Sequence, residues 1–274
     1  MFGMTSLALI ITGFLSLGFS RYAKKAVLEY RIMAGQSNVY CRSNLSMGST
    51  TMPRLKIISV KIIILAAMFM LSSNNAIACE SMNNSKLASV EEVIAFFAAQ
   101  NKTVLTFTGY SGAGYEDEAA MLTIAANILD QHDPARTIVN IGATPDGIGA
   151  VYPLAREKGF ATTGIVSTQA REHDAALSPC VQQVFYIEDD TWGGVLESTG
   201  QLSATSSAMV AVSDIMIGIG GGEVTRDELL AARAVGKTVQ FFPADMNHQK
   251  ALEKAQKKGL PAPTDFSGAA SKAF

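Results

Sequence analysis

The chain has 274 residues, of which 48% are hydrophobic and 17% are charged, and its formal net charge is −2. This composition supplies enough apolar residues for a buried core and excludes an intrinsically disordered chain. The charge is unevenly spread, because residues 80–274 contain 14 basic and 23 acidic residues, a net charge of −9. An acidic domain repels a phosphate backbone, so we expect no nucleic-acid partner, although a small anionic ligand can still bind local backbone N–H groups.

Residues 52–78 have the three parts of a secretory signal peptide. Basic residues follow Met52, a short apolar run extends from Ile62 to Leu71, and a cleavage site of the A-x-A form stands at 76–78. The apolar run is shorter than a comfortable transmembrane span. The sequence therefore predicts an exported protein, either periplasmic or membrane-anchored.

The upstream segment, residues 1–51, contains a second apolar run from Phe2 to Phe19 with basic residues after it. A signal peptide acts from an N-terminus, and a complete one begins at Met52. We therefore interpret residues 1–51 as spurious or non-native sequence. The alternative is a true N-terminal membrane anchor.

Cys79 directly follows the predicted cleavage site and gives it the form of a bacterial lipobox, with Ala76 where leucine is more common. Lipidation of Cys79 would make the protein a lipoprotein. Without lipidation, Cys79 and Cys180 are the two cysteines of the mature chain, because Cys41 is removed with the upstream segment. An exported protein can form a disulfide between them, and two unpaired thiols are the third alternative.

The mature chain opens with a linker and a first helix in residues 79–102, where Ser89 and Glu92 form a capping box. Residues 103–259 then alternate between apolar runs and helix-like stretches. The expected strands are Thr103–Thr108, Thr137–Ile141, Thr162–Val166, Gln183–Ile187, Ile215–Ile219 and Thr238–Phe242. The expected helices are Glu116–Gln131, Ile148–Lys158, Gln169–Leu177, Ser203–Val212, Thr225–Val235 and Asn247–Lys258.

This alternation predicts an α/β fold with a doubly wound, mostly parallel, Rossmann-like sheet in one ligand-binding domain. The strands are continuous apolar runs, as expected when helices cover both faces of the sheet. Residues 260–274 are rich in proline, alanine and serine, and we expect them to form a flexible tail.

Two glycine-rich turns follow strands at the same edge of the predicted sheet, where ligands of such folds bind. The residues that we take as ligand contacts are Gly109, Ser111, Gly112, Gly114, Gly220, Gly221 and Gly222. Glycine permits close approach to a ligand, and the N–H groups of a following helix can bind phosphate. The sequence therefore predicts a small, phosphate-bearing, nucleotide-like ligand held on both turns. Close packing of strand, turn and helix is the structural alternative for these glycines.

Thr225 and Glu228 follow the second turn and allow two interpretations. They have the spacing of a capping box, with Thr225 as the N-cap and Glu228 bonding back to it. Alternatively, Thr225 contacts the ligand, and Glu228 binds a ribose hydroxyl or acts as a general acid or base. Glu223 is a second candidate for that catalytic role.

These motifs resemble the superfamily that includes the LOG-type cytokinin-activating phosphoribohydrolases and the SLOG group of nucleotide-ligand sensors. Its first motif, a Gly-Ser-Ser-like turn, corresponds to residues 109–112, and its Pro-Gly-Gly-x-Gly-Thr-x-x-Glu motif corresponds to Gly220 through Glu228. The resemblance spans roughly residues 103–245 and implies a Rossmann-like fold with a nucleotide ligand.

The chain departs from this family at three positions. Gly220 replaces the motif proline, Val224 replaces its later glycine, and Thr205 stands where the family has its catalytic arginine. A threonine hydroxyl does not replace an arginine that clamps phosphate. The resemblance therefore supports the fold and the ligand class more than it supports hydrolysis.

Three functions follow, of which the leading one is binding of a nucleotide or nucleotide-derived ligand. The second is hydrolysis of an N-glycosidic bond, as in a phosphoribohydrolase, and the third is a structural or interaction domain that has lost its site. The three histidines lack metal-ligand spacing, so we expect no metal and no cofactor. The sequence leaves a homo-oligomer open.

Overall fold

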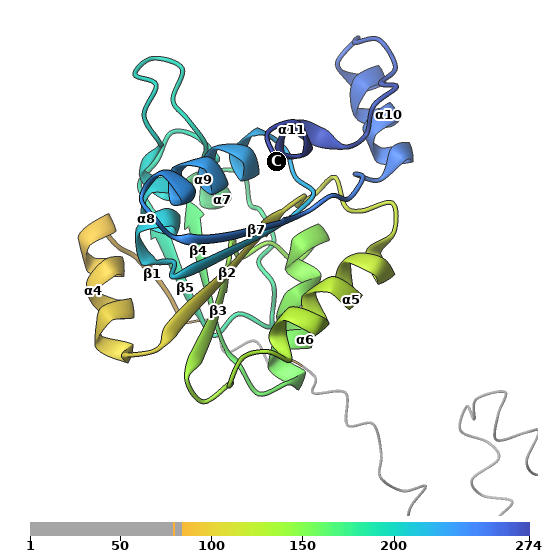
Figure 1. The fold of residues 1–274 in the computed structure, drawn as a ribbon. Coiled ribbons are helices and arrows are strands. Elements are labelled where there is room, and N and C mark those ends of the chain that lie inside the picture. Colours follow the sequence, from red (N-terminus) through yellow and green to blue (C-terminus); the bar gives the residue numbers. More distant parts are fainter. Residues whose placement is uncertain (1–78, 80–83) are drawn as a thin grey trace, which may run out of the picture. The chain divides into compact units, whose positions relative to one another are not determined.

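The computed structural model describes Cys79 and residues 84–274, so the predicted signal peptide and the upstream segment lie outside the described residues. The strands are β1 Asn84–Leu87, β2 Thr103–Gly109, β3 Thr137–Ile141, β4 Ala161–Ser167, β5 Gln183–Ile187, β6 Ile215–Ile219 and β7 Thr238–Phe242. The helices are α4 Val90–Gln100, α5 Glu118–Leu129, η1 Gly147–Ala150, α6 Val151–Glu157, α7 Gln169–Glu172, α8 Ala204–Val212, α9 Glu223–Ala234, α10 His248–Lys257 and α11 Gly268–Ser271. Figure 1 shows their arrangement.

These strands form one parallel sheet in the order β1-β5-β4-β3-β2-β6-β7. The predicted α/β, Rossmann-like fold is confirmed. Strands β2 and β6 are direct neighbours in the register Leu105 to Ile215 through Gly109 to Ile219, although more than 100 residues separate them in sequence. The two glycine-rich turns therefore leave the sheet side by side.

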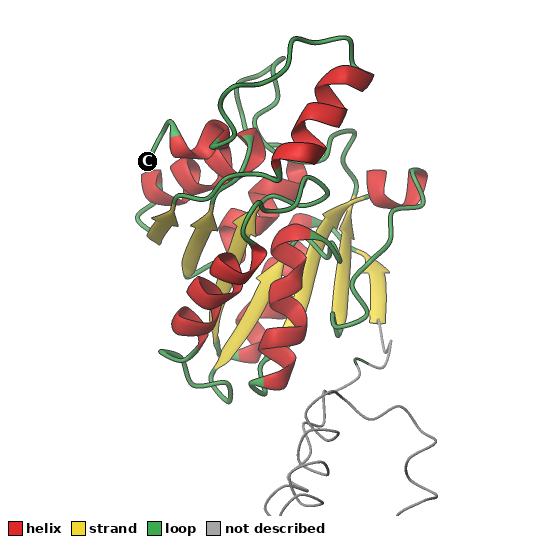
Figure 2. Ribbon diagram, turned by 90° about the vertical axis from the view of Figure 1, so that its right-hand side faces the viewer, coloured by secondary structure: helices red, strands yellow, loops and turns green. Residues whose placement is uncertain are grey.

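Helices cover both faces of the sheet, and each face has its own apolar core (Figures 1 and 2). Alternate residues of β2 point to opposite faces, so Leu105 and Phe107 join the core under α5 and α6. Val104 joins the core under α4, α8 and α9. The helix after β2 and the helix after β6 thus lie on opposite faces, which makes the gap between these strands the topological switch point.

The C-terminal tail packs against the domain, contrary to the flexible tail that we expected for residues 260–274. Ala270 is fully buried, and its N–H donates to the carbonyl oxygen of Gly221 at 3.1 Å. Phe274 packs on Phe241, and the Arg233 guanidinium lies 4.1 Å from the centroid of its ring. The small residues that suggested a loose end are those that fit closely against a turn.

Two other elements differ from their predictions. Strand β1 was not predicted, because it has no apolar pattern and all four of its residues are exposed. Helix α7 stops at Glu172 instead of Leu177, because Asp174 adopts a left-handed backbone conformation with φ of 48°. The predicted capping box of α4 is present, with Ser89 and Glu92 each bonded to the backbone N–H of the other.

Cys79 forms a disulfide with Cys180, and their Cα atoms are 4.8 Å apart. The bond attaches the start of the described chain to the connection between β4 and β5. Within the described residues, no helix combines the length and the apolar character needed to cross a bilayer.

Candidate functional site

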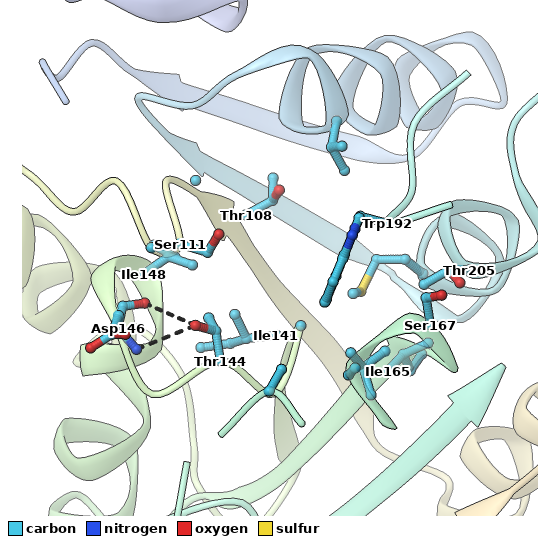
Figure 3. A pocket seen from close by; sticks show the side chains of 18 of the residues that line it. Thr108, Ser111, Ile141, Thr144, Asp146, Ile148, Ile165, Ser167, Trp192 and Thr205 are labelled. Atoms are coloured by element: carbon cyan, nitrogen blue, oxygen red, sulfur yellow. Dashed lines mark hydrogen bonds between the residues drawn. The ribbon is translucent and has the colours of Figure 1, made fainter. Parts of the chain in front are cut away.

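A pocket of about 490 Å³ lies at the carboxyl edge of the sheet, beyond the ends of β2, β3 and β4 and beside α8 and α9 (Figure 3). Its polar lining comes from Thr108, Ser111, Thr144, Asp146, Ser167, Thr205, Thr225 and Glu228. Its larger apolar side chains are Phe107, Ile141, Ile148, Ile165, Val166, Leu177, Trp192, Met209 and Val224. The described residues therefore form a mixed polar and apolar pocket of the size that binds a small organic ligand.

The first glycine-rich turn forms part of this pocket because a tyrosine holds it against β6. The Tyr115 hydroxyl donates to the carbonyl oxygen of Ile219 at 2.7 Å and accepts from the N–H of Tyr110 at 3.2 Å. A Cβ atom at Gly109 would collide with both the Tyr115 hydroxyl and the Ile219 carbonyl. Glycine is thus required at Gly109 for close packing, while the following residues, Ser111 and Gly112, are exposed and line the pocket.

The helix after this turn does not reach the pocket, which corrects the expectation that its N-terminus faces the ligand. Helix α5 starts only at Glu118, and the Asp117 carboxylate caps it by accepting from Ala120 N–H at 2.8 Å. Gly114 lies between, with a left-handed φ of 65° and an N–H that donates to Ser111, and it is buried away from the lining.

The second glycine-rich turn, residues 220–222, does not line the pocket, because other parts of the chain cover it. The Gly220 N–H donates to the carbonyl oxygen of Phe242 at 2.8 Å, and the Gly221 carbonyl accepts from Ala270. Gly222 is the N-cap of α9. Of the predicted ligand contacts, the pocket lining thus includes Gly109, Ser111, Gly112, Thr225 and Glu228, and lacks Gly114, Gly220, Gly221 and Gly222.

Thr225 is buried within the first turn of α9, so the capping-box interpretation of Thr225 and Glu228 is wrong. The helix starts two residues earlier, at Glu223, because glycine serves as its cap. The Thr225 hydroxyl donates to the carbonyl oxygen of Gly109 at 3.3 Å and lies 3.2 Å from Thr108 Oγ1. Thr225 therefore ties α9 to the first glycine turn.

Glu228 is only 4% exposed, and both of its carboxyl oxygens accept hydrogen bonds. Ser206 Oγ donates at 2.8 Å, and Thr108 Oγ1 donates at 3.1 Å. Burial raises the pKa of Glu228 to about 7. The two hydrogen bonds oppose this increase because they favour the ionised form, and the negative charge of Asp227 adds to it. A carboxyl with this pKa can exchange a proton near neutral pH.

Thr205, which stands at the position of the family's catalytic arginine, lies in the pocket wall on α8. Its N–H donates to Asp189 Oδ2 at 2.8 Å. Its hydroxyl is buried and makes no hydrogen bond with the residues that the structure describes. The position of the family's arginine thus holds a short polar side chain whose hydroxyl is enclosed by the protein.

Two residues of the site, Trp192 and Ser206, were not among the predicted contacts. Trp192 lines the pocket from the connection between β5 and α8, and Ser206 holds Glu228. Asp189, in the acidic run that follows β5, is buried. Burial tends to raise the pKa of Asp189, yet hydrogen bonds from the backbone N–H groups of Thr205 and Thr191 hold it below its usual value. The single tryptophan of the chain, followed by two glycines, was the available signal.

No family model and no curated protein matches the chain. Among solved structures, the structural-genomics target TM1055 is 22% identical to this chain, with a TM-score of 0.36. The matched region covers 50% of this chain and 72% of TM1055. Two structures of the molybdenum cofactor carrier protein from Chlamydomonas reinhardtii are 17% and 16% identical, each with a TM-score of 0.36. They cover 51% and 62% of this chain and 76% and 94% of their own. At this identity and TM-score, the likeness gives this chain neither a ligand nor an activity.

Proposed function

We propose that the protein is an exported binding protein that holds a nucleotide or nucleotide-derived phosphate ligand in the pocket at the carboxyl edge of the sheet. The observation that carries the proposal is the position of this pocket. It lies beyond the ends of β2, β3 and β4 and is closed on one side by the start of α9, next to the boundary between β2 and β6 where the helices that follow the two strands diverge to opposite faces. Ligands of open α/β sheets bind at such switch points.

The chemistry of the lining supports a phosphate bound by neutral donors. Ser111 supplies an exposed hydroxyl, and Gly112 supplies backbone without a side chain in the way. The first turn of α9 reaches the pocket at Val224 and Thr225. The first N–H groups of a helix have no hydrogen-bond partner inside the helix, so they can donate to a phosphate. The described lining contains two carboxyl groups, Asp146 and Glu228, and no lysine or arginine. We therefore expect modest affinity that depends on these donors.

The disulfide supports export, because disulfides persist in oxidising compartments and are rare in the cytosol. We expect N-terminal sequencing of the protein from its natural host to begin at or near Cys79. Recovery of intact Met1, or of the protein from the cytosol, would contradict export without affecting the pocket.

Hydrolysis of an N-glycosidic bond is the second candidate, and Glu228 favours it. Its pKa of about 7 suits a general acid or base, and its side chain is part of the lining. However, Ser206 and Thr108 occupy both of its oxygens, and Thr205 replaces the arginine. Incubation with nucleoside monophosphates and chromatography for the free base separates this candidate from binding alone.

The proposal is tested by calorimetric titration of the oxidised mature protein with AMP, GMP, CMP and UMP, each compared with its nucleoside. The matched variants are Gly112→Asp and Gly112→Asn, because an added Cβ meets nothing within 4 Å at this position. We expect the aspartate to weaken binding at least 10-fold through repulsion of the phosphate and the neutral asparagine to have a smaller effect. Absence of binding to wild type, or equal binding by both variants, would overturn the proposal.

A further inference from the structure

Trp192 is the single tryptophan of the chain, and it projects into the pocket while its side chain stays 53% exposed. Figure 3 shows its ring between Thr108 and Ser111 on one side and Ser167 and Thr205 on the other. Burying an indole ring is among the largest single apolar contributions to folding. A half-exposed ring at the wall of a pocket therefore forgoes stability that a core position would provide.

The segment before Trp192 is held firmly in place. The Asp189 carboxylate accepts from the N–H and the hydroxyl of Thr191 at 2.9 and 2.8 Å, and from the N–H of Thr205. The Asp189 carbonyl accepts from Ser167 Oγ at 2.9 Å. Asp189 is thus attached to the end of β4 and the start of α8, and it holds Thr191, the residue before the tryptophan.

The segment after Trp192 is held equally well. The Gly194 N–H donates to Ser206 Oγ at 2.8 Å, and the Val195 N–H donates to Asp227 Oδ2 at 2.9 Å. Gly193 and Gly194 have left-handed φ values of 118° and 87°, which bring the chain against Val224 on α9. The backbone at Trp192 is thus held in place, because both of its flanks are bonded to the scaffold.

One face of the ring is already used, because the imidazole of His173 stacks on it with a centroid separation of 5.8 Å and an interplanar angle of 25°. A flat ring has a second face, and such a ring can stack a nucleobase. Thr205 lies in the same wall of the pocket.

We propose that Trp192 is the stacking platform for the base of the ligand and selects ligands that carry a planar aromatic ring. This inference rests on the proposed nucleotide binding and specifies it, because it assigns the base to the Trp192 wall and the phosphate to the Ser111–Gly112 turn. Stacking depends on ring area, so a purine binds more tightly than a pyrimidine. Loss of a stacking side chain typically weakens binding by roughly 5- to 150-fold.

The test combines fluorescence and calorimetry. Because Trp192 is the only tryptophan, its emission in the wild type reports directly on the site. We expect the tightest of AMP, GMP, CMP and UMP to change this emission, and ribose 5-phosphate, which lacks a base, to bind without changing it. In calorimetry, Trp192→Ala should weaken binding of the nucleotide at least 5-fold and leave the affinity for ribose 5-phosphate unchanged. Trp192→Phe should retain most of the affinity for the nucleotide.

The matched control is Val195→Ala, which shortens an exposed apolar side chain of the same connection outside the pocket lining. Equal nucleotide affinity of Trp192→Ala and wild type would overturn the stacking role and leave nucleotide binding standing. Equal loss of nucleotide and ribose 5-phosphate would also overturn it, because displacement of the loop would then explain the effect. If neither compound binds wild type, the proposed function itself fails, and this inference fails with it.

Discussion

The two glycine-rich turns have similar compositions and adjacent positions, yet the structure uses them differently. The turn after β2 presents Ser111 and Gly112 to the pocket, whereas Gly221 in the turn after β6 lies beneath the C-terminal tail. A glycine run signals that a backbone needs space or an unusual conformation. What approaches that backbone, a ligand or another part of the chain, is decided by distant residues such as Tyr115 and Ala270.

The strongest test of the link between the two turns is Glu228→Gln, because Glu228 follows the second turn and bonds to Thr108 beside the first. The folded state raises the pKa of Glu228 to about 7, so it favours the neutral carboxyl. The stability that this provides is complete below the unfolded-state pKa of about 4.5 and disappears as the pH rises through 7. Glutamine cannot ionise.

The free energy of unfolding of wild type minus that of the variant should therefore fall by on the order of 3 kcal/mol between pH 4 and pH 8. Urea unfolding of both proteins across this range measures the difference. A difference that stays constant with pH would show that Glu228 is not the titrating group.

Alanine substitutions at one glycine of each turn test directly whether the two turns are constrained differently. At Gly221, φ is 122° and an added Cβ would press on the side chain of Thr225, so Gly221→Ala should lower the free energy of unfolding by about 2 kcal/mol. At Gly112 an added Cβ has open space, so Gly112→Ala should change it by less than about 0.5 kcal/mol. Urea unfolding measures both. Equal losses would mean that the two turns are constrained alike.

The hydroxyl of Tyr110 tests what holds the C-terminal tail over the second turn. Tyr110 Oη donates to the carbonyl oxygen of Ser267 at 2.7 Å, at the start of α11. Tyr110→Phe removes this bond and keeps the ring, and it should cost about 1 kcal/mol. Hydrogen exchange should then accelerate at Ala270, whose N–H bonds to Gly221, and not in β2. Unchanged exchange at Ala270 would mean that the tail is held by its apolar contacts alone.

The sequence predicted the regular elements well because their signals are local. Each apolar run from β2 to β7 became a strand, since continuous apolar character is what a sheet with two covered faces requires. The site was harder to predict because long-range packing builds it. Nothing local placed Trp192 and Ser111 in one pocket, and the polar edge strand Asn84–Leu87 has no pattern to detect. Of the two interpretations of Thr225, the cap is wrong because glycine, a weaker signal, occupies the N-cap of α9.

The smallest effect that we predict concerns this N-cap. Gly222 has extended backbone angles, φ −88° and ψ −153°, and a Cβ added there meets nothing within 4 Å. Serine fits these angles, and its hydroxyl can accept from the N–H groups at the start of α9, so Gly222→Ser should raise the free energy of unfolding by a few tenths of a kcal/mol. Gly222→Ala, which has the same Cβ and no acceptor, is the matched control and should not stabilise the protein. Urea unfolding of the two variants in parallel resolves the difference. If both variants are destabilised to the same extent, the tail restricts Gly222 as it restricts Gly221, and the whole second turn is then a packing element.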